Sequence, residues 1–295
     1  MAHRLLLDTP SLTYRAFFAL PASITAVDGQ PVNAVRGYLD MTARLVADRR
    51  PDEVVHVFDH DWRPAARVQA YPGYKARRQP DPEALPAQFQ LLRDVLDALG
   101  QVQAEAPGWE ADDAIGTLCA AADRVDRVDV VTGDRDLIQL VRDAGTAARD
   151  GGSAVRVLFT VKGVSALAVY DEAGVRDRYG IAPSRYADFA VLRGDPSDGL
   201  PGVKGVGEKT ARTLVRDHPS LEALLEGVDT LPPRLAQRIR AASDYLGAMR
   251  QVVPVRCDVE VRLRIGGRDD ARLDALAWQH NLEGPLRRLR QALDA

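Results

Sequence analysis

Runs of apolar and β-branched residues, the first two followed at once by an aspartate, recur through the first half of the chain. Four such runs lie at 4–7, 53–58, 129–132 and 154–159. Short apolar runs bounded by polar residues are typical of strands buried inside a sheet. The intervals between them leave room for helices, so the pattern predicts an α/β fold with a central, mostly parallel sheet flanked by helices.

Helical spacing of apolar residues fills these intervals and then dominates the rest of the chain. We expect helices at 33–47, 85–99, 110–122, 137–141, 171–179 and 183–192, and further helical segments at 214–218, 221–225, 235–249, 273–278 and 286–293. The stretch 252–265 is extended and alternates in part. This pattern predicts an α/β region over 1–180 and a mostly helical region over 181–295.

Composition is that of an ordinary globular protein. The chain has 295 residues, of which 46% are hydrophobic and 27% charged, and a net charge of −3, which by itself gives no sign of nucleic-acid binding. No apolar run is long enough to span a membrane, and the N-terminus becomes acidic too soon for a signal peptide. Cys119 and Cys257 lack metal-ligand spacing, so we expect reduced thiols in a cytoplasmic protein.

Acidic residues stand where the predicted strands end. Asp8 and Asp59 directly follow the first two runs. In open α/β sheets, ligands bind beyond the carboxyl ends of the strands. One aspartate in such a place is explained well enough as a helix N-cap, whereas two at the ends of parallel strands favour a shared site.

Two further acidic groups strengthen this interpretation. Glu110, Asp112 and Asp113 open a predicted helix, and Asp134 and Asp136 follow the third strand. Acids in the first turn of a helix suit its dipole, which is the simpler explanation of the first group. Three acids in four positions are nevertheless more than capping needs, and so many carboxylates predict a site for divalent cations.

The stretch 194–212 joins an acidic turn to a glycine-rich hairpin. Asp195 and Asp198 have a spacing suited to a hard divalent cation. The hairpin from Gly202 to Gly207 leads into a helix, whose first N–H groups favour a phosphate. A short glycine motif alone is weak evidence, and a solvated loop is the alternative. Acids before the hairpin and bases after it favour a nuclease that binds metal ions and nucleic acid.

The segment 63–80 carries bases and aromatics but no acid: Arg63, Arg67, Lys75, Arg77 and Arg78, with Tyr71 and Tyr74. A solvated loop and a mobile segment that engages single-stranded nucleic acid explain this composition equally well. In the second case bases would stack on tyrosine while Lys and Arg hold phosphates. Arg15, which lies among the aromatic residues after the first strand, is a further candidate for a phosphate contact.

Taken in order, these motifs resemble the 5′-nuclease, or flap endonuclease, superfamily, and most closely the 5′→3′ exonuclease domain of bacterial DNA polymerase I. The matching pieces are Leu-Leu-Leu-Asp8, Val-Phe-Asp59, Tyr74-Lys75-Ala76-x-Arg78, Glu110-Ala-Asp-Asp113, Gly133-Asp-Arg-Asp136, and the run from Gly194 to Ala211. The resemblance covers about 5–289, and six motifs in order are far more specific than any one of them.

The resemblance implies a PIN-like 5′-nuclease fold with a basic arch at about 63–85 and a helix-hairpin-helix in the C-terminal helical region. It implies a structure-specific 5′→3′ exonuclease and flap endonuclease that acts in DNA replication and repair. The expected substrates are DNA with 5′ flaps, nicks or gaps, and RNA-primed ends. We expect a monomeric, free-standing member without a polymerase domain.

The resemblance also assigns roles to residues. Two or more Mg²⁺ or Mn²⁺ ions suit this carboxylate-rich, histidine-poor set, and a potassium ion often accompanies the family's hairpin. Lys75 and Arg78 are expected to steer the scissile phosphate in catalysis. The predicted metal ligands are Asp8, Asp59, Glu110 and Asp112 around one ion, Asp134, Asp136, Asp195 and Asp198 around the other, and Asp113 in the same set. The predicted DNA contacts are Arg15, Tyr74, Lys75, Arg78, Gly202, Lys204, Gly205, Gly207 and Lys209.

The chain departs from the family pattern at two turns. Gly199 replaces a common asparagine, and Thr9-Pro10 stands where the family often has glycine, but neither change removes a ligand. A DNA-binding module without catalysis predicts missing acids, and none is missing. An aspartyl-phosphate phosphatase would want an acid at Pro10, and a ribonuclease of the related small nuclease fold would lack the hairpin.

Overall fold

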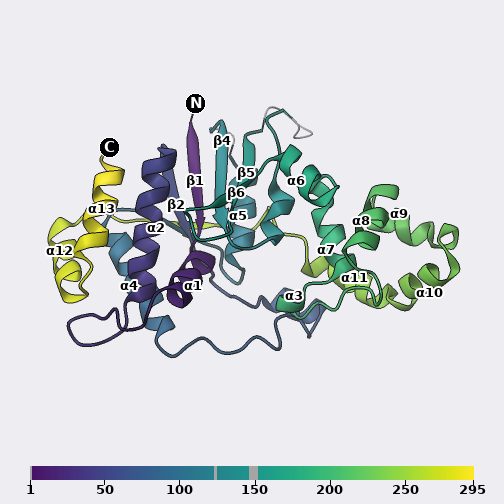
Figure 1. Ribbon diagram of the computed structural model, residues 1–295, viewed down its shortest axis with the longest axis horizontal. Helices are drawn as coiled ribbons and strands as arrows, with labels where there is room; N and C mark the ends of the chain where they lie inside the picture. Colours follow the sequence, from purple (N-terminus) through teal and green to yellow (C-terminus); the bar gives the residue numbers. More distant parts are fainter. Residues whose placement is uncertain (1, 123–124, 146–151) are drawn as a thin grey trace.

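The computed structural model describes residues 2–122, 125–145 and 152–295 (Figure 1). A seven-stranded sheet stands at its centre, in the strand order β6-β5-β4-β1-β2-β3-β7. The strands are β1 (His3–Asp8), β2 (Glu53–Val57), β3 (Val102–Glu105), β4 (Arg127–Thr132), β5 (Ala154–Thr160), β6 (Leu167–Tyr170) and β7 (Arg262–Ile265). The five inner strands are parallel, and the edge strands β6 and β7 are antiparallel to their neighbours, so the predicted mostly parallel sheet is confirmed.

Alternate residues of β1 are buried in different layers. Leu5 and Leu7 pack with one group of helices, whereas Leu6 packs with the other. The first layer contains α2 (Asn33–Arg49), α4 (Leu85–Ala98), α12 (Asp270–Gln279) and α13 (Glu283–Leu293), and the second contains α5 (Ala111–Ala120), α6 (Glu172–Tyr179) and α7 (Tyr186–Arg193). Because successive side chains of a strand point to opposite faces, a continuous apolar run satisfies both layers.

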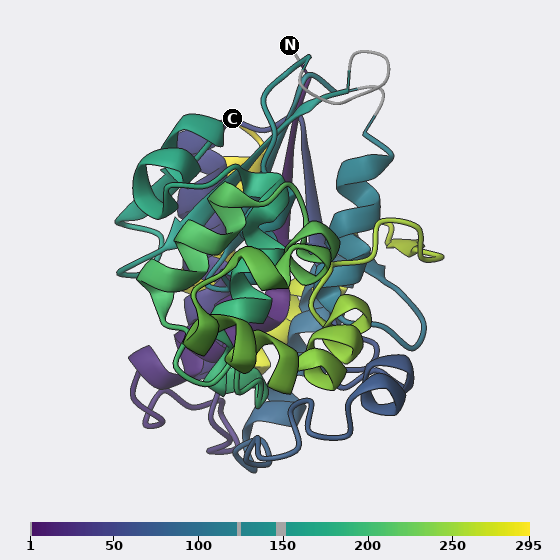
Figure 2. The same cartoon turned by 90° about the vertical axis from the view of Figure 1, so that its right-hand side faces the viewer.

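The chain extends beyond the second layer as a group of helices. These are α8 (Glu208–Asp217), α9 (Leu221–Glu226), α10 (Pro233–Ala241) and α11 (Ser243–Val252). Figure 2 looks along the molecule from this end, with the green helices in front of the sheet. Among the described residues, no helix combines the length and apolar character needed to cross a bilayer.

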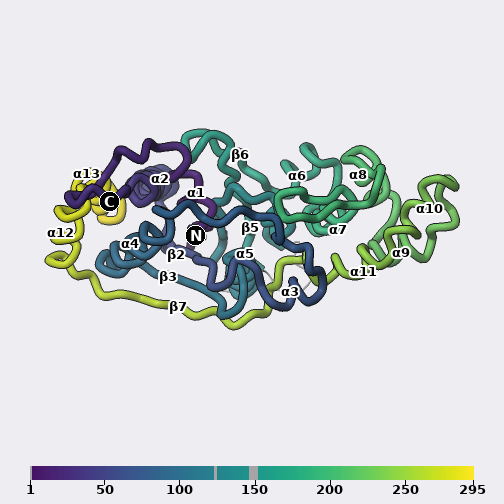
Figure 3. Tube along the Cα trace, turned by 90° about the horizontal axis from the view of Figure 1, so that it is seen from below, coloured from purple at the N-terminus to yellow at the C-terminus, as the bar shows by residue number. Residues whose placement is uncertain are grey.

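After α11 the chain returns to the α/β core along the strap, by which we mean residues 253–261. Figure 3 shows the strap and β7 running along one long side of the molecule to α12 and α13. There β7 pairs with β3, and α13 packs on α2. The predicted division near residue 180 stays a prediction, but residues 262–293 lie against the first region.

Two local expectations were wrong, and one inner strand was missed. The helix expected at 137–141 is the short 3₁₀ turn η1 (Asp136–Leu140), because the chain then turns to bridge Arg142 to Val155. The segment 235–249 forms two helices that meet at Ala242. Strand β3 was not expected, because its four residues include two polar ones, and pairing with β2 and β7 stabilises it instead.

A buried ion cluster ties β1, β4 and β5 together, away from the acidic strand ends. Asp129 is fully buried, and it accepts hydrogen bonds from Arg156 at 2.8 Å and faces His3 Nε2 at 3.0 Å. Burial disfavours the charged carboxylate, but these partners outweigh it and lower the pKa of Asp129 to about 2. The ionised side chain therefore stabilises the folded state.

We expect Asp129→Asn to lower the free energy of unfolding by about 2 kcal/mol at neutral pH, because Arg156 and Arg127 lose their buried anionic partner. A lowered folded-state pKa contributes stability above the unfolded value of 3.8, and that contribution is lost as the pH falls through about 2. The difference between wild type and variant in urea unfolding should therefore shrink between pH 4 and pH 2. A constant difference over this range would contradict the assignment.

Candidate active site

The carboxyl ends of β1 and β4 hold their acids in one hydrogen-bonded unit. Asp8 ends β1 and caps α1 (Thr9–Ala19) by accepting from Ser11 N at 3.2 Å. Its other oxygen accepts from Thr132 Oγ1 at 2.5 Å, and Thr132 in turn accepts from the backbone N–H of Asp134 at 2.8 Å. Capping and site formation, which the sequence left as alternatives, therefore coincide at Asp8.

The end of β2 is joined to the start of α5 in a similar way. Asp59 accepts from Ala111 N at 2.7 Å, so it satisfies one of the first N–H groups of α5. Glu110 is the N-cap residue of the same helix and is almost fully buried. The aspartate that follows β2 and the acids that open α5 therefore meet at the N-terminus of α5, whose first turn also carries Asp112.

The third acidic element is the turn between α7 and the hairpin. Asp195 is the N-cap of the 3₁₀ turn η3 (Pro196–Asp198), where it accepts from Ser197 N at 3.0 Å, and Asp198 is the last residue of that turn. The side chain of Asp198 is only 13% exposed, so this turn closes over the strand ends. The turn therefore adds carboxylates from a part of the chain that is remote from the strands in sequence.

The acids repel one another inside this site. Burial, reinforced by the charges of Asp134 and Asp59, raises the pKa of Asp8 to about 7. Burial also raises the pKa of both Asp59 and Asp198 to about 6. The pKa values of Asp112, Asp134 and Asp136 are raised by burial and by neighbouring carboxylates as well. Such a cluster favours protons or cations.

The hydrogen bonding of Asp136 also indicates that this site lacks positive charge or donors. Its Oδ1 atom is buried and has no hydrogen-bond partner in the described structure. A buried carboxylate oxygen without a partner is costly. The donor set and this free oxygen fit a hard cation. In this conformation, however, no three acidic, histidine or cysteine side chains among the described residues stand close enough to hold one ion together.

A lysine side chain lies between two of these acids and accounts in part for the distance between them. Lys75 Nζ forms an ion pair with Glu110 and lies 3.9 Å from Asp198 Oδ2. Burial opposes the charge of Lys75, but the carboxylates outweigh burial and raise its pKa. Its backbone has a left-handed φ of 51° and donates to Asp198 O at 2.9 Å. The ammonium group therefore lies between two acids that the sequence assigns to different metal ions.

Gly199 belongs to the same close contact. Its φ of 73° is left-handed, and an added Cβ would lie 2.6 Å from the carbonyl oxygen of Gly73. An asparagine, common here in the family, tolerates that φ but carries the Cβ. The departure from the family pattern thus follows from close packing of the arch on the acidic turn.

The other predicted DNA contacts outside the hairpin, two in the arch and one in α1, differ in their surroundings. The Tyr74 ring is 4% exposed, and its hydroxyl donates to Glu110 at 2.6 Å, so it presents no free face for a base in this conformation. Arg78 Nη2 lies 3.6 Å from Asp198, with 41% of the side chain exposed. Arg15 donates to Thr160 O at 2.7 Å. The role of Tyr74 in stacking stays a prediction, and it requires the segment to move.

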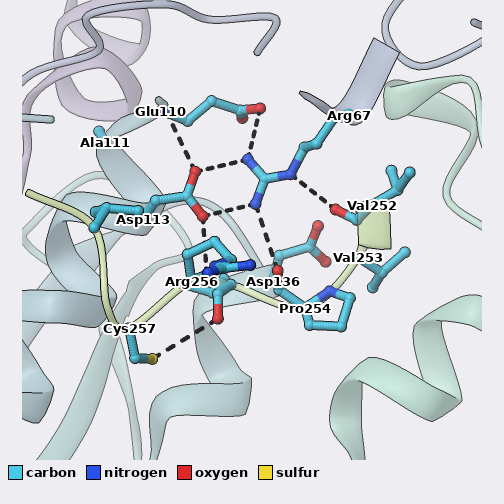
Figure 4. Close-up of polar contacts among 12 residues, drawn as sticks. Arg67, Glu110, Ala111, Asp113, Asp136, Val252, Val253, Pro254, Arg256 and Cys257 are labelled. Carbon is cyan, nitrogen blue, oxygen red and sulfur yellow. Dashed lines mark hydrogen bonds and ion pairs between the residues drawn. The ribbon is translucent and has the colours of Figure 1, made fainter. Parts of the chain in front are cut away.

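Asp113 is held by Arg67 and by the backbone at Arg256, as Figure 4 shows. Both of its oxygens accept from Arg67 at 2.7 Å, and Oδ1 also accepts from Arg256 N at 2.9 Å. Arg67 belongs to α3 (Ala65–Ala70) at the foot of the arch and also donates to Val252 O at 2.9 Å and Glu110 at 3.0 Å. One buried guanidinium thus ties the arch, α5 and the end of α11 together.

The three hairpin glycines have different surroundings. A Cβ on Gly202 would lie 2.5 Å from the backbone of Arg193, so close packing requires this glycine. Gly205 has a φ of 77° and sits beside Arg238, which donates to its carbonyl at 3.1 Å. A Cβ on Gly207 would meet nothing within 4 Å, and its φ of −93° suits any residue. The fold itself therefore gives no reason for glycine at 207.

Two family models cover nearly the whole chain. The model described as "5′-3′ exonuclease, N-terminal resolvase-like domain" matches residues 3–180, and the one described as "5′-3′ exonuclease, C-terminal SAM fold" matches residues 181–274. The chain belongs to the 5′-3′ exonuclease family. The resemblance inferred from six short motifs is therefore confirmed, and the protein is a nuclease that hydrolyses phosphodiester bonds.

Individual relatives agree with this placement of the exonuclease. The 5′-3′ exonuclease of Streptomyces coelicolor is 47% identical over 311 residues, covering 99% of this chain and all of the relative. DNA polymerase I of Mycobacterium bovis is 43% identical over 239 residues, which is 80% of this chain and 25% of the polymerase. The structure of bacteriophage T5 flap endonuclease with DNA and metal ions has a TM-score of 0.67 at 17% identity, covering 99% of this chain and 98% of that one. At that identity the likeness shows a shared fold.

Sequence reasoning missed three residues of the exonuclease site region. Arg67 was grouped with the arch bases, and nothing local distinguishes it from them. Trp62 was not singled out, although it lies three residues after Asp59. Arg238 lies 33 residues beyond Gly205, and only the fold brings it to the hairpin.

Proposed function

We propose that this exonuclease is a structure-specific 5′→3′ exonuclease and flap endonuclease that cleaves DNA with two or more bound Mg²⁺ or Mn²⁺ ions. The observation that carries the proposal is the group of buried carboxylates at the strand ends, with raised pKa values and one oxygen without a partner. Hard divalent cations prefer such oxygen ligands.

Eight acids would hold the ions. Asp113 leaves the predicted set, because both of its oxygens are committed to Arg67 and the Arg256 backbone. Bound divalent ions would activate water and stabilise the leaving oxygen of the phosphodiester. The proposed ligands are Asp8, Asp59, Glu110 and Asp112 on one side, and Asp134, Asp136, Asp195 and Asp198 on the other.

Lys75 and Arg78 would act on the substrate itself. Lys75 already shares a buried site with Glu110, and Arg78 lies at its exposed rim. Once substrate is bound, the Lys75 ammonium group would pair with a phosphate oxygen. The two cations would then orient the scissile phosphate and stabilise the charge that develops on it.

The hairpin and the start of α8 would hold the duplex. Gly207 is the N-cap of α8 and has no side chain. Lys204 and Lys209 lie within three residues of it in sequence, and Arg238 contacts the hairpin at Gly205. Helix N-termini bind phosphates, and such contacts carry no base information. A potassium ion at the hairpin is part of the proposal, although the Gly205 carbonyl already accepts from Arg238.

Gly207→Ser tests the approach of a phosphate to the hairpin. Serine is a good N-cap, so the variant should fold with unchanged or slightly higher stability. Its side chain would occupy space that the fold leaves open, so duplex affinity should fall by about tenfold, whatever the DNA sequence. Titration with two unrelated duplexes measures this. Gly205→Val is a poorer probe, because its positive φ strains the variant without DNA. Unchanged affinity would assign the hairpin to scaffolding.

The proposed setting is DNA replication and repair in the cytoplasm, with the protein acting as a monomer. Substrates would be 5′ flaps, nicked or gapped duplexes and RNA-primed ends. The supporting feature is the juxtaposition of a duplex-binding hairpin and a basic arch on one acidic site, which suits a junction between duplex and single strand.

The deciding experiment compares labelled flap, nicked, gapped and single-stranded DNA as substrates, with Mg²⁺, Mn²⁺ or EDTA. We expect cleavage only with a divalent ion, and faster cleavage of the flap than of the single strand. Equal rates on flap and single-stranded DNA would refute structure specificity, and full activity in EDTA would refute the metal mechanism.

A further inference from the structure

Trp62 lies exposed beside the acidic site. It follows Asp59 by three residues, and 45% of its surface is exposed. Tryptophan is usually well buried, because its large ring loses much contact with water on burial. An exposed tryptophan next to a catalytic cluster therefore needs an explanation other than the stability of the free protein.

Hydrogen bonds hold the residues on both sides of Trp62 in place. The N–H groups of His60 and Asp61 both donate to the Trp109 carbonyl, at 3.2 and 3.0 Å. On the other side, Arg63 Nε donates to Tyr74 O at 2.7 Å. The ring is therefore presented from an anchored loop, so little ordering remains to be done when a ligand packs against it.

A single guanidinium links this ring to the acids. The Arg78 guanidinium carbon lies 5.8 Å from the Trp62 ring centroid, and its Nη2 lies 3.6 Å from Asp198 Oδ1. A cation near an aromatic ring is attracted to it and is thereby oriented. Arg78 is also a residue proposed to hold the scissile phosphate. The ring thus lies one residue away from the place proposed for the phosphate.

The other aromatic rings of this region already have partners. Tyr74 is buried on Glu110, and Tyr71 packs edge-on against Tyr245 with centroids 6.1 Å apart. The guanidinium carbons of Arg67 and Arg256 lie 5.9 and 5.8 Å from the centroid of the Trp109 ring. Within the described part of the chain, this leaves Trp62 as the exposed ring around the arch.

We propose that Trp62 is a stacking site for a nucleobase of the single-stranded 5′ segment, next to the phosphate held by Arg78. The inference rests on the proposed function and adds a specific subsite to it. Stacking on tryptophan tolerates any base, because every base has a π face. The ring would set the position of the 5′ strand without selecting a sequence.

The test combines a protein change with a substrate change. Flap DNA with natural bases is compared with flap DNA carrying one abasic nucleotide, placed in turn at each of several positions around the scissile phosphate. Affinity is measured with Ca²⁺ in place of Mg²⁺, and cleavage is measured separately with Mg²⁺. Wild type should lose about tenfold in affinity when the stacked base is missing.

Three variants complete the design. Trp62→Ala should bind intact DNA about tenfold more weakly and become insensitive to the abasic position, whereas Trp62→Phe should keep most of the affinity. Trp278→Ala is the matched control, because Trp278 is 68% exposed on α12, which lies at the left end of the molecule in Figure 1, well away from α3. Thermal unfolding of each variant checks that it folds.

Two outcomes would overturn the proposal. Trp62→Ala might bind intact DNA like wild type, or it might remain as sensitive to the abasic position as wild type, and either result would exclude stacking. Failure of the proposed function looks different, because wild type itself would not prefer the intact flap over single-stranded DNA in the cleavage assay.

Discussion

Asp136→Ala is expected to abolish detectable cleavage while leaving the metal-free protein at least as stable as the wild type. The loss of a proposed metal ligand should slow cleavage by at least about a thousandfold. Stability should not fall, because the Asp136 oxygen is buried without a partner and neighbouring carboxylates raise its pKa. Removing it should add about 1 kcal/mol, or about 2 °C in Tm.

The pH dependence of stability follows from the same acids. Folding raises the pKa of Asp8 to about 7 and that of Asp59 to about 6, from 3.8. A raised carboxyl pKa means that the folded state binds the proton more tightly, so the contribution of these two acids to stability is greatest at low pH and is lost as the pH rises from 3.8 through their folded-state values. Metal-free wild type should therefore lose stability between pH 4 and pH 7, and Asp136→Ala should lose less.

Metal binding gives a readout that does not depend on activity. Mg²⁺ should raise the Tm of the wild type, and this rise should be much smaller for Asp136→Ala and Asp198→Ala. Asp48→Ala is a suitable control, since Asp48 is an exposed acid on α2 whose partner is Arg44. A variant that unfolds without metal, as seen by circular dichroism, would show that Asp136 is structural.

Arg67→Ala is expected to produce the opposite pattern, a large loss of stability. The side chain is 3% exposed and donates to Asp113, Glu110 and Val252 O (Figure 4). Removing one partner of a buried ion pair costs about 3–5 kcal/mol, because the other charge is left without compensation. Arg67→Lys should be intermediate, since an ammonium group cannot reproduce the two-pronged contact with Asp113.

Variants of Asp113 can distinguish a structural role of this residue from a role in metal binding. Asp113→Ala should destabilise the protein both with and without Mg²⁺, yet the rise in Tm caused by Mg²⁺ should remain. The double variant Arg67→Met, Asp113→Leu should recover part of the stability, because it leaves neither buried charge alone. A lost response to Mg²⁺ in a folded Asp113 variant would return Asp113 to the ligand set.

The sequence predicted the acids of the site because each stands at the end of an element with a local signature. Asp8 and Asp59 directly follow apolar runs, and parallel strands bring such ends to one edge of the sheet. The order of motifs then identified the family. Both inferences depend on neighbours in sequence and on one general rule of sheet geometry.

The partners of these acids could not be predicted in the same way. Arg67 meets Asp113 across 46 positions and Val252 across 185, so nothing near Arg67 in sequence distinguishes it from a DNA-binding arginine. Tyr74 was assigned to DNA for the same reason, although the fold buries its ring against Glu110. Exposure and pairing of a side chain are decided by distant packing.

The return of the chain to β7 has a consequence for synthesis on the ribosome. Strand β3 forms the edge of the sheet until residues 262–265 arrive, because its outer hydrogen-bonding groups pair with β7. Domains generally fold from the N-terminus as they emerge, and an unpaired strand edge invites association with other chains. The sheet of the N-terminal region is therefore completed only after β7 has been synthesised. A nascent chain that stops after α11 would expose the unpaired edge of β3, which could pair with other chains.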